Sequence, residues 1–255
     1  MTLFSKCAFV AVGLCASVAT LHAAPVNGTG NVTPDVIFGS GNANGSFTGQ
    51  TANNIEVGLR GKQRYPAANT FNYDGDHTYT FDSTVLTTNP SNRSVFNFEW
   101  SVNVDQNGLS GDKLSAYDYS FGFDTDPTSG VSYTFIDPFT TLGYFDHALG
   151  TNATANGGGI ESSSNAELVT NMGVFNVAQQ SSNLGFGFSS DPDLAGLYSF
   201  SFSVFEKGTQ TLLSSSTINV AVAPLPVPEP ATLSLVLGAL GLLGYASRRR
   251  AKRQG

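Results

Sequence analysis

The feature that most constrains the fold of this chain is a strict alternation of apolar and polar residues in several short runs. In each run, aromatic or aliphatic residues are separated by single small or polar residues. A period of two is typical of β-strands that have one buried face and one face in water. We therefore predict strands whose aromatic faces form a core and whose small polar faces meet solvent. The runs are 96–104, 117–124, 131–135, 184–188, 198–204 and 218–222.

Turn-forming residues separate these runs, as at Asn107-Gly108 and Lys207-Gly208. Many short strands with such punctuation predict an all-β fold, a single antiparallel β-sandwich that is jelly-roll-like. Within the mature domain, only 165–172 has a pattern that suits a helix. The sandwich domain is expected at residues 55–223.

Residues 24–54 are rich in Gly, Asn, Ser and Thr, so we predict a flexible entry to the domain, with a short strand near Val36 at most. Before it, Lys6, the apolar stretch 7–21 and the small residue Ala23 have the layout of a secretory signal peptide at residues 1–23. An uncleaved N-terminal anchor is the alternative.

Both cysteines, Cys7 and Cys15, lie inside the predicted signal peptide. The mature protein would then contain no cysteine and no disulfide bond. Its stability must come from an ordinary hydrophobic core.

The C-terminal residues 224–255 contain three blocks in a fixed order. Val227, Pro228, Glu229 and Pro230 come first, and the prolines exclude a continuous helix there. The uncharged segment 231–246 follows; as a helix it would span roughly 24 Å, somewhat less than the hydrocarbon core of a bilayer. Basic residues that would stay on the cytoplasmic side end the chain, and they include Arg248, Arg249 and Arg250.

These three blocks together resemble the PEP-CTERM protein-sorting signal of Gram-negative bacteria. The resemblance implies that an exosortase, a membrane-embedded sorting protease, recognises the tail and cuts it near Pro228-Glu229-Pro230. It further implies transient anchoring in the inner membrane through a transmembrane helix at 231–246, and then a location at the cell surface or in the extracellular matrix. A biofilm and exopolysaccharide setting is also implied by the tail. An ordinary tail anchor is the alternative, whereas five basic residues after the apolar segment argue against a GPI signal.

The chain has 12 basic and 19 acidic residues. Without Lys6, Glu229 and the five basic residues of the tail, 6 basic and 18 acidic residues remain, which gives the mature protein a net charge near −12. Such a charge repels phosphate backbones, so we exclude nucleic acid as a partner.

Few residues suggest metal binding, so we expect no cofactor. His77 and His147 are interpreted as partly exposed loop histidines. Asp124, Asp126 and Asp137 are weak candidates for calcium ligands, but the spacing of a helix-loop-helix calcium site is missing. The alternative for these carboxylates is that they form Asx turns between strands.

We expect no enzymatic activity and no catalytic residue. A glycosidase would need two facing carboxylates, for which Glu99 and Asp118 are the available strand residues. Glu99 is interpreted as a residue of a solvated strand face.

Exposed aromatic residues could bind a carbohydrate. Trp100 lies in the middle of an alternating run and is expected in the core, which leaves Tyr65 and Tyr144 as freer candidates. The basic cluster of Arg60, Lys62 and Arg64 is expected on a solvated strand face, with a site for an acidic polysaccharide as the alternative.

The sequence thus predicts an exported surface or matrix protein with a structural or adhesive role. A carbohydrate- or calcium-binding module is the second hypothesis, and a secreted polysaccharide hydrolase is the third. The expected partners are an exosortase, the inner membrane in transit and an extracellular polysaccharide.

Overall fold

The computed structural model describes residues 26–63, 69–73, 77–84, 93–128, 130–143, 146–189 and 194–223. Within these ranges no helix is long and apolar enough to cross a membrane. The predicted signal peptide, the Pro-Glu-Pro segment, the membrane helix at 231–246 and the arginine cluster lie outside the described residues, as do Arg64, Tyr65 and Tyr144.

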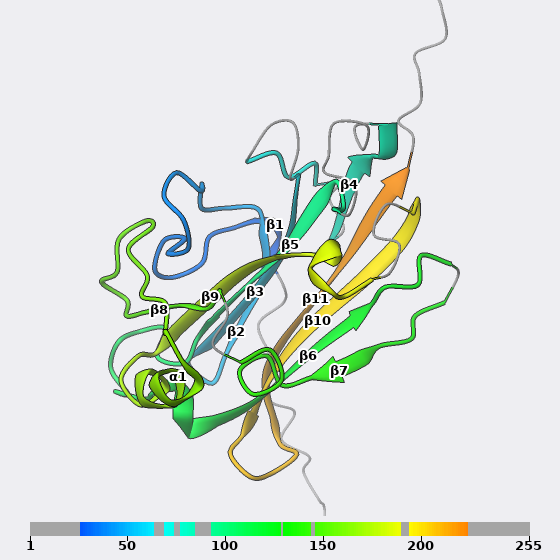
Figure 1. Ribbon diagram of the computed structural model, residues 1–255. Helices are drawn as coiled ribbons and strands as arrows, with labels where there is room; N and C mark the ends of the chain where they lie inside the picture. Colours follow the sequence, from blue (N-terminus) through cyan, green and yellow to red (C-terminus); the bar gives the residue numbers. More distant parts are fainter. Residues whose placement is uncertain are drawn as a thin grey trace, which may run out of the picture.

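Two β-sheets pack face to face and form a sandwich (Figure 1). The six-stranded sheet has, in spatial order, β1 (Val26–Gly30), β2 (Phe47–Ala52), β3 (Ile55–Gln63), β5 (Phe96–Asn103), β9 (Val177–Asn183) and β8 (Ala148–Gly150). The five-stranded sheet has β4 (Thr78–Asp82), β11 (Leu212–Ala223), β10 (Gly196–Glu206), β6 (Tyr117–Asp124) and β7 (Thr134–Ile136). The helices are α1 (Asn165–Met172) and two 3-10 turns, η2 (Leu114–Ala116) and η3 (Leu184–Phe186).

The predicted all-β fold is confirmed, but the strands are not all antiparallel. Strand β4 runs parallel to β11, with Thr78 opposite Asn219, whereas the neighbouring strands elsewhere in both sheets are antiparallel. The two strands of the parallel pair lie far apart in the sequence, and alternation in a single strand carries no information about the direction of its partner. The sequence could therefore predict the strands but not this pairing.

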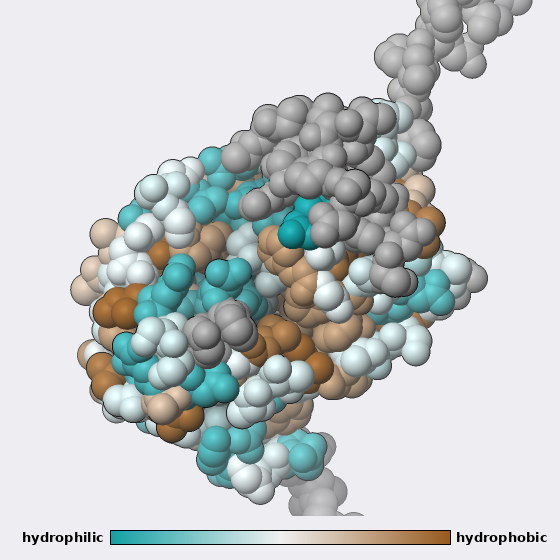
Figure 2. Space-filling model, in the orientation of Figure 1, coloured by the Kyte–Doolittle hydropathy of each residue, from teal (hydrophilic) through white to brown (hydrophobic). Residues whose placement is uncertain are grey.

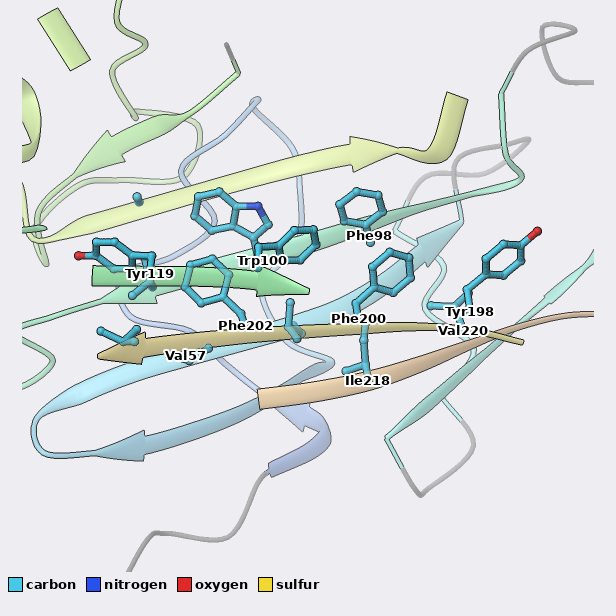
Figure 3. Packing of buried hydrophobic residues seen from close by; sticks show 14 of the residues in the cluster. Val57, Phe98, Trp100, Tyr119, Tyr198, Phe200, Phe202, Ile218 and Val220 are labelled. Atoms are coloured by element: carbon cyan, nitrogen blue, oxygen red, sulfur yellow. The ribbon is translucent and has the colours of Figure 1, made fainter. Parts of the chain in front are cut away.

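The aromatic runs form the core between the sheets, as predicted (Figure 3). The ring of Phe98 on β5 stacks on that of Phe200 on β10, with centroids 4.6 Å apart. Next to them, the ring centroid of Trp100 lies 5.1 Å from that of Phe202. Each sheet contributes every second residue, so the rings interdigitate and bury the large apolar area that stabilises a chain without disulfides.

Helix α1 has the predicted bounds. The hydroxyl of Ser164, the N-cap residue, accepts a hydrogen bond from the backbone N–H of Glu167 (3.2 Å). This cap satisfies one of the free N–H groups at the start of the helix.

Two of the predicted strands are wrong or shorter than expected. Residues 184–188 form η3 and a turn, because the side chain of Asn183 accepts a hydrogen bond from Gly185 N–H (3.0 Å) and Gly187 has a left-handed φ of +104°. In the run 131–135 only the last residues belong to a strand, β7, and Phe135 is exposed. Alternating aromatic residues in a turn are thus indistinguishable by sequence from those of a strand.

The surface is mixed. In the view of Figure 2, hydrophilic residues separate the hydrophobic ones into several patches.

Shortening a core ring should destabilise the sandwich strongly. Phe200 is fully buried, so Phe200→Ala should lower the free energy of unfolding by about 3–5 kcal/mol. The matched control Phe135→Ala removes a ring that is 62% exposed and should change it by less than about 1 kcal/mol. Urea denaturation measures both; equal losses would contradict the assignment of the core.

Candidate functional site

Three charged side chains lie buried together on the face of the six-stranded sheet that points away from the core. Arg60 on β3 is directly opposite Glu99 on β5 in the strand register. The Nε of Arg60 donates to Oε2 of Glu99 at 2.6 Å, and the Nζ of Lys62 lies 2.6 Å from Oε1 of the same carboxylate. We call Arg60, Lys62 and Glu99 the ion triple. Its position follows from the period of two, which puts residues 60, 62 and 99 on the face opposite Leu59 and Trp100.

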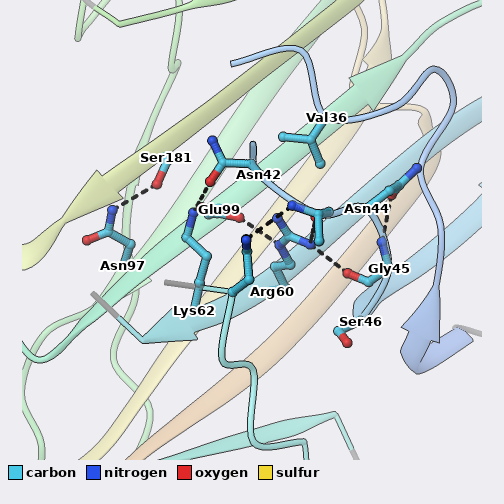
Figure 4. A network of polar contacts seen from close by, with 12 residues as sticks. Val36, Asn42, Asn44, Gly45, Ser46, Arg60, Lys62, Asn97, Glu99 and Ser181 are labelled. Carbon is cyan, nitrogen blue, oxygen red and sulfur yellow. Dashed lines mark hydrogen bonds and ion pairs between the residues drawn. The ribbon is translucent and has the colours of Figure 1, made fainter. Parts of the chain in front are cut away.

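Residues 31–46 cover the ion triple, and we call them the N-terminal cover (Figure 4). One guanidinium nitrogen of Arg60 donates to the carbonyls of Ala43 (2.9 Å) and Gly45 (2.6 Å). The Nζ of Lys62 donates to Oδ1 of Asn42 at 2.6 Å. The cover shields Arg60 and Lys62 from water, and its carbonyl and amide oxygens replace the water as hydrogen-bond acceptors.

Aromatic rings complete the enclosure of Arg60. Its guanidinium carbon lies 4.1 Å from the ring centroid of Phe47 and 4.4 Å from that of Phe71. The positive charge therefore has a carboxylate in its plane and rings above its faces, an arrangement that suits a planar guanidinium.

The prediction of a solvated strand face for Arg60, Lys62 and Glu99 is therefore wrong. All eight residues of β5 are buried, because the cover closes over the face that alternation assigned to water. Residues 31–46 likewise do not form the flexible entry that their composition suggested. Their Asn side chains and backbone groups find partners on the sheet instead of in solvent.

Backbone groups of the cover are held at further points along the sheet. The N–H of Thr33 donates to Oε1 of Glu56 (2.6 Å), and that of Ile37 donates to Oε1 of Gln179 (2.8 Å). Burial raises the pKa of Glu56 from 4.5 to about 7, although the hydrogen bond from Thr33 acts in the opposite direction.

Close packing of the cover requires a glycine in β3. A Cβ placed on Gly58 would lie 2.7 Å from Cγ1 of Val32, so a larger residue would push the cover away from the sheet.

A pocket of about 270 Å³ opens beside the ion triple, between the cover and β9. Its walls combine aromatic rings, amide and hydroxyl groups, one ammonium group and two carboxylates. The lining residues are Phe38, Gly39, Asn42, Lys62, Asp146, Glu161, Ser181 and Phe186.

A second pocket of about 260 Å³ adjoins the first, and the two share Asp146 and Phe186. Strand β9 pairs with β8 only over Val177–Gln179, and the second pocket lies beyond that pairing, against Gln180 and Ser182. These two side chains alternate with Ser181 and lie on the core side of β9, so the two pockets flank the same strand from its two faces. Below we call the two pockets together the groove.

Phe186 is held in place at the centre of the groove. The guanidinium carbon of Arg93 lies 4.6 Å from its ring centroid, and a guanidinium nitrogen of Arg93 donates to the carbonyl of Gly185 at 2.9 Å. The ring nevertheless remains 45% exposed, so part of it is available to a ligand.

The charges around the groove are not balanced. Lys62 pairs with Glu99, a carboxylate that it shares with Arg60, whereas Asp146 and Glu161 are exposed and make no hydrogen bond or ion pair with any other described residue. The described lining residues of the groove therefore include two unpaired carboxylates, while their one ammonium group already has partners.

The three calcium candidates form Asx turns within the loops that contain them. A carboxylate oxygen of Asp124 accepts from the N–H of Asp126, and Asp126 accepts in turn from Thr128 (both 3.1 Å). Asp137 accepts from the N–H of Phe139 at 2.9 Å. In the part of the chain that the structure describes, no group of three or more His, Cys, Asp and Glu side chains is placed to hold a metal ion.

The other predicted candidates do not meet. Glu99 and Asp118 belong to different sheets, and Asp118 forms an exposed ion pair with Lys207 (2.9 Å).

His77 is half-buried in a loop, as predicted. His147 is fully buried, contrary to the prediction, because it immediately precedes the buried strand β8. Its ring centroid lies 5.2 Å from that of Phe139.

Sequence reasoning did not predict the groove. Its residues come from the N-terminal cover, β3, the loop before β8, the loop before α1, and the end of β9 with η3. No spacing connects them in the sequence. The only local signal was the pair Arg60 and Lys62, which was interpreted as a cluster of free cations.

Fold and site define a β-sandwich domain with an acidic, aromatic groove beside strand β9. The particular affiliation comes from the tail: the family model of the PEP-CTERM protein-sorting motif matches residues 226–250, so the chain carries that sorting motif. The motif implies export, membrane anchoring in transit and processing by an exosortase, a membrane protease. No curated protein and no solved structure matches the chain.

Breaking the ion triple should destabilise the domain. Glu99→Gln keeps the shape of the side chain but leaves two buried cations without a counter-charge, so we expect a loss of about 3–5 kcal/mol in the free energy of unfolding. Asp118→Asn is the control, since it breaks an exposed ion pair and should leave stability almost unchanged. Chemical denaturation measures the free energy of unfolding of both variants. An unchanged value for Glu99→Gln would show that the ion triple is solvated and would contradict the prediction.

Glu56 should make stability depend on pH. Its pKa is higher in the folded than in the unfolded chain, so folding is favoured most below pH 4.5 and loses roughly 3 kcal/mol of this contribution as the pH rises to about 7. Glu56→Gln cannot ionise and should be more stable than the wild type at pH 8, with the difference fading towards pH 4.5. Melting temperatures across this range measure it. A difference that does not change with pH would refute the buried carboxyl.

Proposed function

We propose that this chain is an exosortase-sorted protein of the cell surface or extracellular matrix, with a structural or adhesive role in a biofilm or exopolysaccharide matrix of a Gram-negative bacterium. The observation that carries the proposal is the sorting motif at residues 226–250, which makes the rest of the chain its cargo. The apolar segment 231–246 anchors the exported chain during transit, and the arginines after it stay on the cytoplasmic side.

Properties of the cargo support this role. The fully packed aromatic core explains how a mature chain without cysteine remains folded outside the cell. Its net charge near −12 keeps separate copies soluble and away from anionic lipid surfaces once the tail has been removed.

The test is the intact mass of the protein recovered from its host. We expect a chain that has lost both the signal peptide, near Ala23, and the residues that follow the Pro-Glu-Pro segment. Replacing Pro228, Glu229 and Pro230 by Ala should leave the arginine cluster on the recovered protein, as should deletion of the host's exosortase.

As a matched control, Pro224 lies just before the matched residues, and replacing it by Ala should leave processing intact. Recovery of Arg248–Arg250 on the wild-type protein from the cell surface would contradict the proposal.

A further inference from the structure

The groove has a composition that tail sorting does not require. Two phenyl rings, two free carboxylates and the side chains of Asn42 and Ser181 line the first pocket. Aromatic rings with a few polar groups are typical of sites for small polar ligands rather than of solvent-exposed sheet faces.

We propose that the groove binds a polysaccharide that carries amino sugars with free ammonium groups. The inference rests on the proposed function, because a cell-surface or matrix protein meets such a polymer. A sugar ring presents both an apolar face, which stacks on Phe38 and Phe186, and hydroxyl groups, one of which hydrogen-bonds to Ser181.

The free carboxylates select the charge of the ligand. Asp146 and Glu161 have no partner among the described residues, so an ammonium group can form a charge-assisted hydrogen bond with either of them without breaking an existing contact.

The same electrostatics exclude an acidic polysaccharide. Lys62 lines the pocket, but its ammonium group is 2.6 Å from Glu99 and 2.6 Å from the Asn42 oxygen, so it already has two partners. A uronic acid would meet two free carboxylates and a strongly acidic domain. Arg60 and Lys62 therefore belong to the support of the groove and not to an anion site.

The presence of two pockets favours a polymer over a single sugar. The first and second pockets are of similar volume and meet at Asp146 and Phe186. Two neighbouring sugar units could occupy them, with Phe186 between and the charge of Asp146 within reach of both. A longer oligomer should accordingly bind more tightly than a monomer.

Isothermal titration calorimetry of the protein purified from its host tests the inference. The probes are a glucosamine hexamer, the N-acetylglucosamine hexamer, a neutral glucose hexamer and a galacturonic acid hexamer, at pH 6 where the amine is charged. We expect the glucosamine hexamer to bind at least tenfold more tightly than the other three, and salt to weaken its binding. Equal binding of the neutral or N-acetylated hexamer, or preference for the acidic one, would overturn the proposal.

Variants place the ligand in the groove. Asp146→Asn with Glu161→Gln should weaken binding of the glucosamine hexamer at least tenfold. Asn tolerates the left-handed backbone of residue 146 (φ +56°), and both side chains are exposed, so the fold should be kept and the melting temperature unchanged. Phe186→Ala should weaken the binding of the hexamer as well.

The matched control, Asp126→Asn with Glu206→Gln, removes the same two charges from exposed positions outside the groove. It should bind as the wild type does. An equal loss in the control would mean that the polymer binds through the overall charge, and would overturn the groove as the site. Because binding is measured on purified protein, its failure leaves tail processing untouched, and failure of processing leaves the binding result valid.

Discussion

The structure depends on the burial of both faces of the central strands β3 and β5. One face meets the other sheet through aromatic rings, and the opposite face carries Arg60 and Glu99, which cannot be left dry without partners. The N-terminal cover supplies those partners through carbonyl groups and Asn side chains. A buried charge thus fixes where the cover lies, because the guanidinium must meet the carbonyls of residues 43 and 45. The position of the cover in turn creates the wall of the groove that contains Phe38 and Asn42.

Much of the fold could be predicted from the sequence, because apolar and polar residues alternate regularly along the strands. The alternating residues of β5, β6, β10 and β11 identify which face of each strand is buried, because large rings at every second position must face the core. Trp100 is one of the residues assigned correctly in this way. The polar positions were misinterpreted. Asn, Ser and Glu residues whose hydrogen bonds are satisfied by protein look the same in sequence as residues satisfied by water, and Glu99 is the clearest case. Nor could alternation reveal that β4 pairs in parallel with β11, since pairing depends on the whole topology.

The tail and the sandwich differ in what their sequences disclose. The sorting motif is local, with its three blocks in a fixed order, so it can be recognised without a structure and is confirmed by its family match at residues 226–250. The groove is assembled from five separate segments, and each of its residues has an ordinary surface or core explanation when taken alone. Phe186 resembled a strand residue and Glu161 a loop residue until the fold placed them around one hollow. Function carried by a motif can therefore be predicted from the sequence, whereas function carried by a surface requires the fold.

The central claim is that residues 31–46 are a fixed part of the domain, held over the buried ion triple. Hydrogen–deuterium exchange of the native protein tests it most directly at the amides of Val32, Thr33 and Ile37, which donate to side chains of Asn44, Glu56 and Gln179. The account predicts that these three amides exchange far more slowly than those of an unstructured chain, with protection that approaches that of β5. Exchange of all three at the rate of an unfolded peptide, while β5 stays protected, would contradict it.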